Sequence, residues 1–359
     1  MTSTAELPGL DLVPVCDWLS DRGLGLPAPV TASLFTGGRS NVTYRLTGAD
    51  GASLVIRRPP LGHVLPSAHD MAREFRVLSG LNTVGYPTPR MLALCEDLSV
   101  NGSAFLVMAY VEGRIVATAG DAAVLSPAER DGVSGALVDA LARLHGIDAA
   151  TAGLAELGRP EGYLPRQLAR WTKQWELTRT RDLPSMDALG ACIESALAPL
   201  PAELPWSLVH GDYRLDNVIL APDGPEVRAV LDWEMSTLGD PLADLALTLV
   251  YWTEAGDRLR RRIPVAERLT DAPGFWGRAR LIDAYAATTG RAMDHLDACT
   301  ALACFKLAVI TESIHARTLS GKQLGAAAGD THAIGLATEA LAELGLRVCD
   351  AGTVAGLAS

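Results

Sequence analysis

Apolar residues in this 359-residue chain follow two different spacings, and the change falls near Gly113. Before it, short runs of β-branched and apolar residues alternate with turn sequences, as they do in antiparallel hairpins. After it, apolar residues recur every three to four positions, as they do along one face of an α-helix. This order restricts the chain to an α+β fold with two unequal lobes, a β-sheet lobe first and a mostly helical lobe second.

The first lobe is expected to contain a short leading helix, one longer helix and an antiparallel sheet. Its three initial strands are separated by turns at 36–41 and 48–51, which predicts a meander. The expected helices lie at 11–22 and 69–81, and the expected strands at 30–35, 42–47, 53–58, 91–95 and 104–110.

The second lobe is expected to be helical, with one small β insertion. Ser126 and Glu129 have the spacing of a capping box, with a proline between them at the first helical position. Helices are expected at 126–146, 162–178, 185–198 and over most of 241–346, short strands at 207–209 and 227–231, and frayed residues over the last dozen. We therefore divide the chain into a first lobe at 1–108, a connector at 109–113 and a second lobe at 114–359.

Polar residues are concentrated in the segment between the two short strands. Asp212 comes two positions after His210, and four residues separate Asp212 from Asn217. Asp232 ends the next apolar run. This is the spacing of a kinase catalytic loop, in which the first Asp accepts the proton of a substrate hydroxyl. An Asn oxygen and a second Asp carboxylate suit Mg²⁺, which prefers oxygen ligands. One Asp at a strand end is more often a cap or a turn former, but that does not explain the ordered set.

The block HGDYRLDNVIL, followed by VLDWEMSTLGDPLADLA, closely resembles the aminoglycoside-phosphotransferase family, which has a protein-kinase-like fold. The resemblance covers essentially the whole chain. It implies a cytoplasmic enzyme that uses ATP and Mg²⁺, with Asp212 as the catalytic base and Asn217 and Asp232 as metal ligands. His210 would brace the loop, and Asp240 and Asp244 would cap a helix and hold the loop in place.

A nucleotide-covering loop is expected between the first two strands. Its residues are Gly37, Gly38, Arg39, Ser40 and Asn41. Glycines let the backbone approach phosphates, and amide N–H groups or a hydroxyl can donate to them. An ordinary hairpin turn would explain the same residues, and the pattern is not the glycine motif of protein kinases.

Arg57 occupies the place on the third strand where a kinase carries lysine. Its guanidinium can bind phosphate oxygens and pair with a carboxylate, for which Glu74 on the following helix is the expected partner. The neighbouring Arg58 is expected to be solvated, although the sequence leaves open which of the two arginines points inward.

The connector resembles a kinase hinge. Backbone groups of Ala109, Tyr110 and Val111 would bind an adenine ring, and Met108 would lie behind it. An ordinary buried strand accounts equally well for the apolar run.

Several features resemble the kinase-like domains found with acyl-CoA dehydrogenases: IRRPP at 56–60, the tryptophan-containing helix from Gly162, and the segment from Asp232 to Pro241. This resemblance implies a hydroxyacyl-CoA or related hydroxy acid as the acceptor. An antibiotic acceptor and an inactive nucleotide-binding module remain alternatives, whereas a protein kinase lacks support because no Ala-Pro-Glu element is present. The basic cluster at 258–262 is expected to be a solvated helix end, and contact with CoA phosphates is the alternative.

Composition excludes some other classes of function. The net charge of −11 disfavours nucleic acid as a partner, so the expected partner is a small-molecule hydroxyl acceptor. The most apolar run, 242–252, is too short to span a membrane. No CxxC pair occurs among the six cysteines, which are expected to be reduced and mostly buried. The sequence carries no signal for an oligomeric state.

Overall fold

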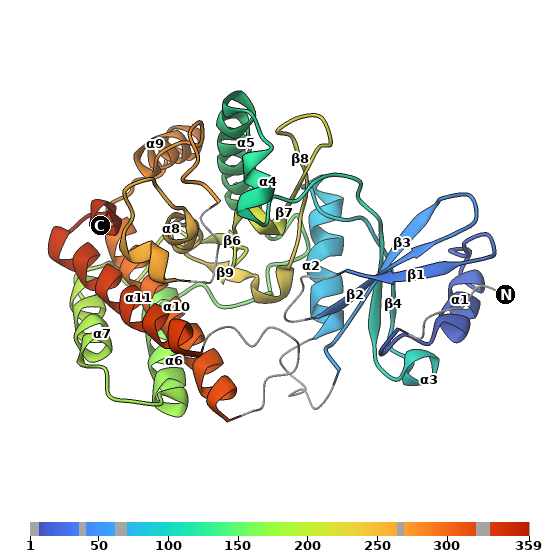
Figure 1. The fold of residues 1–359 in the computed structure, drawn as a ribbon, viewed down its shortest axis with the longest axis horizontal. Coiled ribbons are helices and arrows are strands. Elements are labelled where there is room, and N and C mark those ends of the chain that lie inside the picture. Colours follow the sequence, from blue (N-terminus) through green and yellow to red (C-terminus); the bar gives the residue numbers. More distant parts are fainter. Residues whose placement is uncertain (1–6, 36–40, 62–69, 264–268, 321–330, 359) are drawn as a thin grey trace.

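The computed structural model describes residues 7–35, 41–61, 70–263, 269–320 and 331–358. An antiparallel sheet forms one lobe and helices form most of the other, with α2 (Met71–Thr83) between them (Figure 1). The predicted α+β fold is confirmed.

The sheet of the first lobe has five strands in the order β1-β2-β3-β5-β4, and every pair is antiparallel. The predicted meander is therefore confirmed. The strands are β1 (Thr31–Leu34), β2 (Val42–Thr47), β3 (Ser53–Arg58), β4 (Met91–Cys95) and β5 (Phe105–Ala109).

Each face of this sheet is covered by a different helix, because successive side chains on a strand point to opposite faces. On one face, Ile56 belongs to a buried cluster with residues of α1 (Leu12–Ser20). On the other face, Val55 packs with Met71 at the start of α2. Arg57 therefore shares the α2 face with Val55, and Arg58 shares the α1 face with Ile56.

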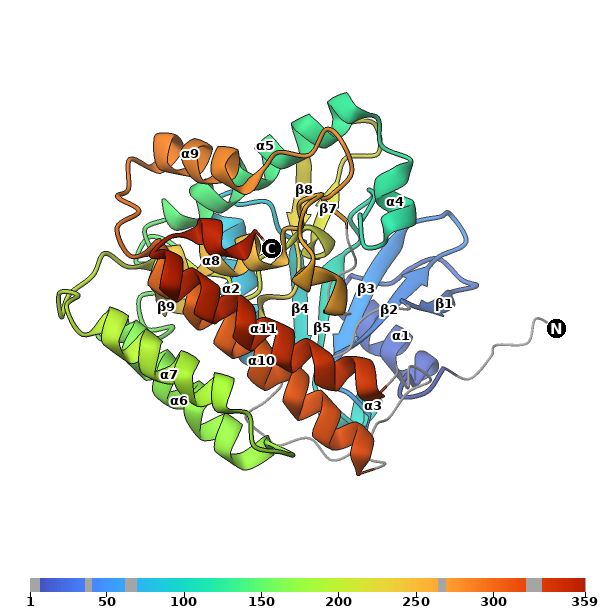
Figure 2. The same cartoon turned by 60° about the vertical axis from the view of Figure 1, so that its left-hand side comes forward.

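The second lobe is built around the long helix α10. Figure 2 shows α10 and α11 side by side, with α6 and α7 along them. A short α3 (Leu98–Asn101) lies in the first lobe. The helices of the second lobe are α4 (Ala119–Ala123), α5 (Pro127–His145), α6 (Tyr163–Thr178), α7 (Pro184–Leu197), α8 (Pro241–Tyr251), α9 (Arg278–Thr289), α10 (Leu296–Leu319) and α11 (Thr331–Ala351).

The predicted capping box of α5 is present: Ser126 and Glu129 exchange side-chain-to-backbone hydrogen bonds. Helices cover most of the described part of 241–346, as predicted, although no α-helix occurs in the described part of 252–277. The prediction that the last dozen residues are frayed is wrong for the described ones, because Val354 and Leu357 are buried beyond the end of α11.

Two small antiparallel sheets hold the polar segment of the second lobe. In one, β6 (Ser207–Val209) pairs with β9 (Thr237–Gly239), and in the other, β7 (Val218–Leu220) pairs with β8 (Val227–Val230). Short 3₁₀ turns follow Arg214 and Asp232. β6 and β8 match the two predicted strands, whereas β9, which is three residues long, was not predicted.

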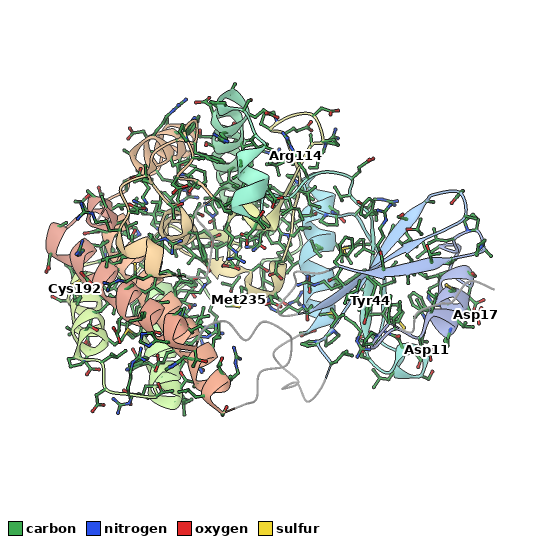
Figure 3. All side chains as sticks on the ribbon, viewed as in Figure 1. Asp11, Asp17, Tyr44, Arg114, Cys192 and Met235 are labelled. Carbon is green, nitrogen blue, oxygen red and sulfur yellow. A yellow bond between two sulfur atoms is a disulfide. The ribbon has the colours of Figure 1, made fainter. Side chains whose placement is uncertain are left out.

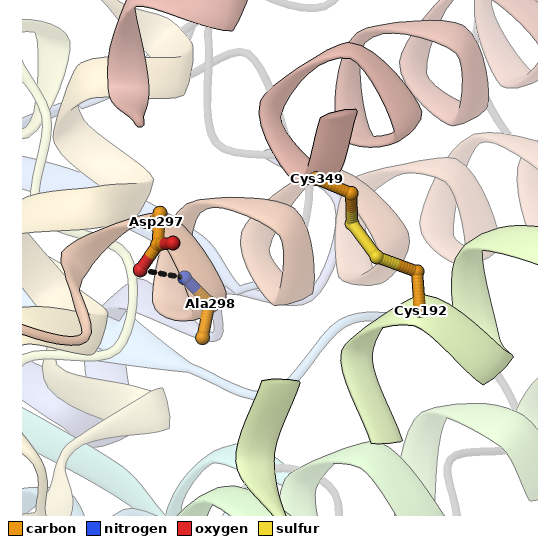
Figure 4. The surroundings of a disulfide bond; sticks show 4 residues. All are labelled: Cys192, Asp297, Ala298 and Cys349. Carbon is orange, nitrogen blue, oxygen red and sulfur yellow. Dashed lines mark hydrogen bonds between the residues drawn. A yellow bond between two sulfur atoms is a disulfide. The ribbon is translucent and has the colours of Figure 1, made fainter. Parts of the chain in front are cut away.

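Cys192 on α7 and Cys349 on α11 form a disulfide, and their Cα atoms are 6.5 Å apart (Figure 4). The prediction of six reduced cysteines is therefore wrong for this pair. The two positions are 157 residues apart in the chain, so only the packing of α7 against α11 brings them together. Cys16, Cys95, Cys299 and Cys304 are free, and the last three are buried.

Helix α10 is the one described helix that is long and apolar enough to cross a membrane. Its most apolar window is 78% buried inside the protein, which is the environment of a core helix.

Candidate active site

The loop between β6 and β7 is held by a buried carboxylate on α8. Asp244 accepts hydrogen bonds from the backbone N–H groups of His210, at 2.5 Å, and Gly211, at 2.7 Å. His145 on α5 contacts the same carboxylate at 3.3 Å. Burial alone would raise the pKa of Asp244, but these hydrogen bonds and the nearby imidazoles keep it below its ordinary value. The predicted bracing role of Asp244 is confirmed.

His210 is fully buried and its ring is fixed from both sides. Its Nε2 lies 2.7 Å from the Leu231 carbonyl, and its Nδ1 lies 3.1 Å from the Asp212 N–H. The second contact requires Nδ1 to accept, so Nε2 carries the proton and donates to Leu231. The imidazole therefore connects the Asp212 loop to the strand end before Asp232, as expected for a bracing residue.

Gly211 has φ +84°, and a Cβ atom there would lie 2.7 Å from the Met235 carbonyl. Met235, labelled in Figure 3, belongs to the 3₁₀ turn after Asp232. Only glycine fits this conformation and this close approach. The glycine of the His-Gly-Asp motif thus lets the two polar segments lie against each other.

Asp212 and Asn217 face each other across the loop. Asn217 donates through Nδ2 to the Asp212 carbonyl at 2.9 Å and to its carboxylate at 3.4 Å. The Asp212 carboxylate remains 26% exposed, so a substrate can reach it. No described residue donates to the amide oxygen of Asn217, so that oxygen can take another ligand.

Asp232 is the one described non-glycine residue with a positive φ, +66°. This left-handed conformation is uncommon, although Asp tolerates it better than most residues. Its carboxylate lies 2.6 Å from Arg57 Nη2, and Arg57 Nε lies 3.0 Å from Glu74 on α2. One arginine thus joins a strand and a helix of the first lobe to the second lobe.

The pKa values in this cluster reflect both burial and charge. Burial raises the pKa of Glu74, and the Arg57 guanidinium opposes that rise. For Arg57, burial favours the neutral form, but the carboxylates of Glu74 and Asp232 outweigh it and raise its pKa. Arg57 therefore stays charged.

Strand alternation decides between the two arginines of β3. Arg57 points into the site, as expected. Arg58 is buried on the other face and donates to the carbonyls of Gly9 and Pro59, so the expectation that it is solvated is wrong.

The expected nucleotide loop is described only at its end. Gly37, Gly38, Arg39 and Ser40 lie outside the described residues. Asn41 is buried and donates to Glu234 Oε2 at 3.2 Å, so the end of the loop contacts the segment after Asp232.

The connector forms an extension of the sheet lobe. Met108 is buried, the Ala109 N–H donates to the Arg90 carbonyl at 2.9 Å, and the Arg45 guanidinium lies 3.9 Å from the Tyr110 ring centroid. Beyond it, Arg114 (labelled in Figure 3) bonds Leu220 of β7 through two backbone hydrogen bonds. The connector is thus tied to the strand that follows Asn217.

Two site residues were not recognised from the sequence. Arg214 lies 3.6 Å from the Asp212 carboxylate and 3.0 Å from Asp216. Lys306 on α10 donates to the Gly211 carbonyl at 2.7 Å. Arg214 lies between Asp212 and Asp216 inside the His210–Asn217 motif, so it could have been recognised from the sequence. Lys306 is 95 residues from Gly211, and nothing in the sequence indicates that the two are in contact.

The basic cluster at 258–262 is only partly solvated. Arg258 and Arg262 are exposed, but Arg260 is buried and donates to the Tyr251 carbonyl at 3.2 Å. Burial and the neighbouring Arg278 lower its pKa to about 10.

A cavity of about 1400 Å³ runs between α6 and α7. Apolar side chains, among them Leu168, Trp175 and Phe305, form much of its wall, and Asp240 lies at its border. Asp212, Asn217 and Asp232 do not line it. Asp240 caps α8 by accepting from the Leu242 N–H, as predicted, and contacts His295 at 2.7 Å.

A family model matches most of the chain. The model of the phosphotransferase enzyme family (APH) matches residues 31–298. Acyl-CoA dehydrogenase family member 10 of Mus musculus is 36% identical over 322 residues, which are 88% of this chain and 29% of that protein. The chain thus spans less than a third of that relative.

Solved structures share the fold. A Ralstonia eutropha protein, whose name likens it to aminoglycoside phosphotransferases, is 32% identical, with a TM-score of 0.78 over 94% of this chain and 98% of its own. A thermostable variant of an aminoglycoside phosphotransferase, in complex with ADP and hygromycin B, is 14% identical, with a TM-score of 0.58 over 90% and 96%. The second likeness shows the fold alone. With its kinase-like fold, its polar loop and these matches, the chain belongs to the phosphotransferase enzyme family.

Proposed function

We propose that this protein transfers the γ-phosphate of ATP to a hydroxyl group of a small molecule. The observation that carries the proposal is the convergence of Asp212, Asn217 and Asp232 beside an arginine that is already paired with Glu74. Phosphoryl transfer needs little covalent help from the protein and depends on aligning the acceptor oxygen and offsetting phosphate charge.

Asp212 is the group we assign to the acceptor. Its carboxylate is accessible, and its backbone is fixed by His210 and Asn217, so it can accept the hydroxyl proton from a defined direction. Arg214 lies close enough to offset negative charge on the transferred group.

Asn217 and Asp232 would hold Mg²⁺. The fit rests on their donor atoms: an amide oxygen to which no described residue donates, and a carboxylate in which one oxygen is bound to Arg57. Both are the hard oxygen ligands that Mg²⁺ takes together with phosphate oxygens. When bound, Mg²⁺ would offset the charge of the terminal phosphates.

The nucleotide is assigned to the face between β3, the connector and the loop at 37–41. Arg57 would contact phosphate oxygens, together with Gly37, Gly38, Arg39, Ser40 and Asn41. Backbone groups of Tyr110 and Val111 would meet adenine beside Met108, because the Ala109 N–H is already bonded.

For the acceptor we favour a hydroxyacyl-CoA or a related hydroxy acid. The relative at 36% identity is named as an acyl-CoA dehydrogenase, and the largely apolar cavity between α6 and α7 suits an acyl chain better than a polycation. An aminoglycoside or other antibiotic is the second candidate, favoured by the similarity to the Ralstonia eutropha protein. The proposal also includes a small molecule, and not nucleic acid, as the partner, and a cytoplasmic location. The Cys192–Cys349 disulfide is unusual for a cytoplasmic protein.

The test is ADP release by the purified protein with Mg·ATP and a panel of hydroxyacyl-CoAs, free hydroxy acids, aminoglycosides and macrolides. Acceptor-dependent release that is lost in Asp212→Ala supports the proposal and selects the acceptor class. Mg·ATP binding with no release for any acceptor would favour the inactive nucleotide-binding module. Absence of nucleotide binding would refute the proposal.

A further inference from the structure

Lys306 places a positive charge next to the catalytic loop. It projects from α10, and its Nζ lies 2.7 Å from the carbonyl of Gly211, the residue before Asp212. The same Nζ lies 5.8 Å from the centroid of the Trp171 ring on α6. The ammonium is thus positioned between the helices of the second lobe and the proposed acceptor base.

A small cavity of about 40 Å³ opens beside this ammonium. Its walls include Tyr163, Gln167 and Trp171 of α6, Gly211 of the loop, and Lys306 itself. A cavity of this size can hold a small polar group of a ligand next to the ammonium. A ligand group in this cavity would lie against Gly211, the residue before Asp212 in the chain.

The Lys306 ammonium has more donors than its described partners use. It carries three N–H groups, and among the described residues one of them is accounted for, by the Gly211 carbonyl. Burial lowers the pKa of Lys306, and the charges of Asp212 and Asp244 oppose that effect. An unused donor at a partly buried cation is costly unless another acceptor approaches it.

The cation beside this cavity is a lysine, a residue type that is rare in this chain. Of the 31 basic residues in the chain, 28 are arginines, and Lys306 is one of three lysines. A guanidinium is a broad fork that binds carboxylates in two places, whereas an ammonium is a compact point charge.

The surroundings favour a neutral oxygen over a second full negative charge. Asp212 and Asp244 both lie near the ammonium, and a carboxylate placed there would be repelled by them. A carbonyl oxygen accepts a hydrogen bond without that repulsion. A polycationic acceptor would have to approach Lys306 itself and Arg170, whose guanidinium is 5.4 Å from the Trp171 ring.

We propose that Lys306 binds a carbonyl oxygen of the acceptor, a few bonds from the hydroxyl that is phosphorylated, and so selects acyl compounds over polyamines and simple alcohols. This inference rests on the proposed phosphotransferase function, and it identifies the carbonyl as the acceptor group that the second lobe recognises. The competing role is purely structural, in which Lys306 only steadies the loop through Gly211.

The experiment measures binding of three matched probes by saturation-transfer NMR, with the full chain loaded with Mg²⁺ and a non-hydrolysable ATP analogue. The probes are 3-hydroxybutanoyl-CoA, free 3-hydroxybutanoate and butane-1,3-diol, which keeps the carbon skeleton and the hydroxyl but has no carbonyl. We expect 3-hydroxybutanoyl-CoA to bind wild-type protein at least about tenfold more tightly than the free acid or the diol, and Lys306→Met to abolish this preference.

Two further variants separate the roles of Lys306. Lys306→Gln keeps a donor for the Gly211 carbonyl but removes the charge. It should therefore fold like wild type and still lose most of the preference for the carbonyl probe over the diol. It also replaces Lys306→Met in the experiment if that variant does not fold. Arg347→Met removes one exposed positive charge on α11 and should leave the preference intact.

Binding of the thioester but not the free acid supports a neutral carbonyl as the group that Lys306 binds, and binding of the free acid but not the thioester would overturn the inference. The inference is overturned if wild type binds none of the carbonyl probes, or if both Lys306 variants bind them as wild type does. Failure of the proposed function would give a different result, namely no ADP release with any acceptor. The binding measurement is independent of that result, because it uses a non-hydrolysable ATP analogue.

Discussion

The two halves of the candidate active site are held by different kinds of interaction. The Asp212 loop is fixed within the second lobe by a buried network around Asp244 and His210. The nucleotide side depends on Arg57, which reaches from the first lobe to Asp232, and the Asp232 side chain is 27% exposed. The acceptor base is therefore preset by packing, whereas the nucleotide side depends on how the two lobes sit together.

Removing the acceptor base should give the largest effect. Asp212→Ala keeps the Asp244 network and the Arg57 cluster, so nucleotide affinity should change little while turnover falls about 10³-fold, within the range for a lost general base. ADP release and ATP-analogue binding, measured on the same preparation, check this. Near-full turnover in the variant would remove Asp212 from its assigned role.

Breaking the buried network should cost stability. Asp244→Ala leaves the buried His210 N–H and the partly buried Gly211 N–H without partners, and we expect the free energy of unfolding to fall by about 3 kcal/mol. Because the folded pKa of Asp244 is depressed, its contribution is present above the ordinary pKa of about 3.9 and is lost as pH falls through the lower folded value.

Denaturant titrations at several pH values test this second prediction. The difference in unfolding free energy between wild type and Asp244→Ala should be constant near neutrality and shrink below about pH 4. If the alanine variant does not fold, Asp244→Asn, which keeps one acceptor oxygen for the loop, provides the same comparison. A difference that grows in acid would show that the sign of the pKa shift is wrong.

The sequence predicted local features of the site well because they depend on spacing along one segment. The His210–Asn217 motif, the capping role of Asp240 and the strand that carries Arg57 all follow from residues close in the chain. The face of β3 on which Arg57 lies could not be predicted from the sequence. Side chains alternate between the two faces of a strand, but the face of at least one residue must be known first. The neighbouring Ile56 and its burial against α1 settle it.

Features that depend on helix packing were not predictable. Lys306 and the Cys192–Cys349 disulfide each join segments about a hundred residues apart or more. The apolar pattern predicted the helices, but nothing in their sequences sets which faces meet. The buried end of the chain at Val354 and Leu357 was missed for the same reason, since small residues pack well only when a partner surface is present.

Weakening the nucleotide side should give a smaller effect than either change at the loop. Asp232→Ala removes a proposed Mg²⁺ ligand and the partner of Arg57, and we expect Mg·ATP affinity to fall at least about tenfold, or 1.4 kcal/mol. Calorimetric titration at several Mg²⁺ concentrations measures it. Asp223→Ala, which removes a carboxylate from an exposed turn, is the control. Equal affinities in the two variants would contradict the metal assignment.

The smallest effect is expected at Asp240, the N-cap of α8, where the pH dependence has the opposite sign to that of Asp244. The hydrogen bond from His295 to Asp240 raises the pKa of His295. Its contribution is therefore complete below the ordinary value of about 6.5 and is lost as pH rises through the higher folded value. His295→Gln should cost about 1 kcal/mol at pH 6, and the cost should disappear as pH rises through that value. Thermal unfolding from pH 6 to 9 would test this. A cost that persists to pH 9 would mean that packing, and not the charge on His295, provides the contribution.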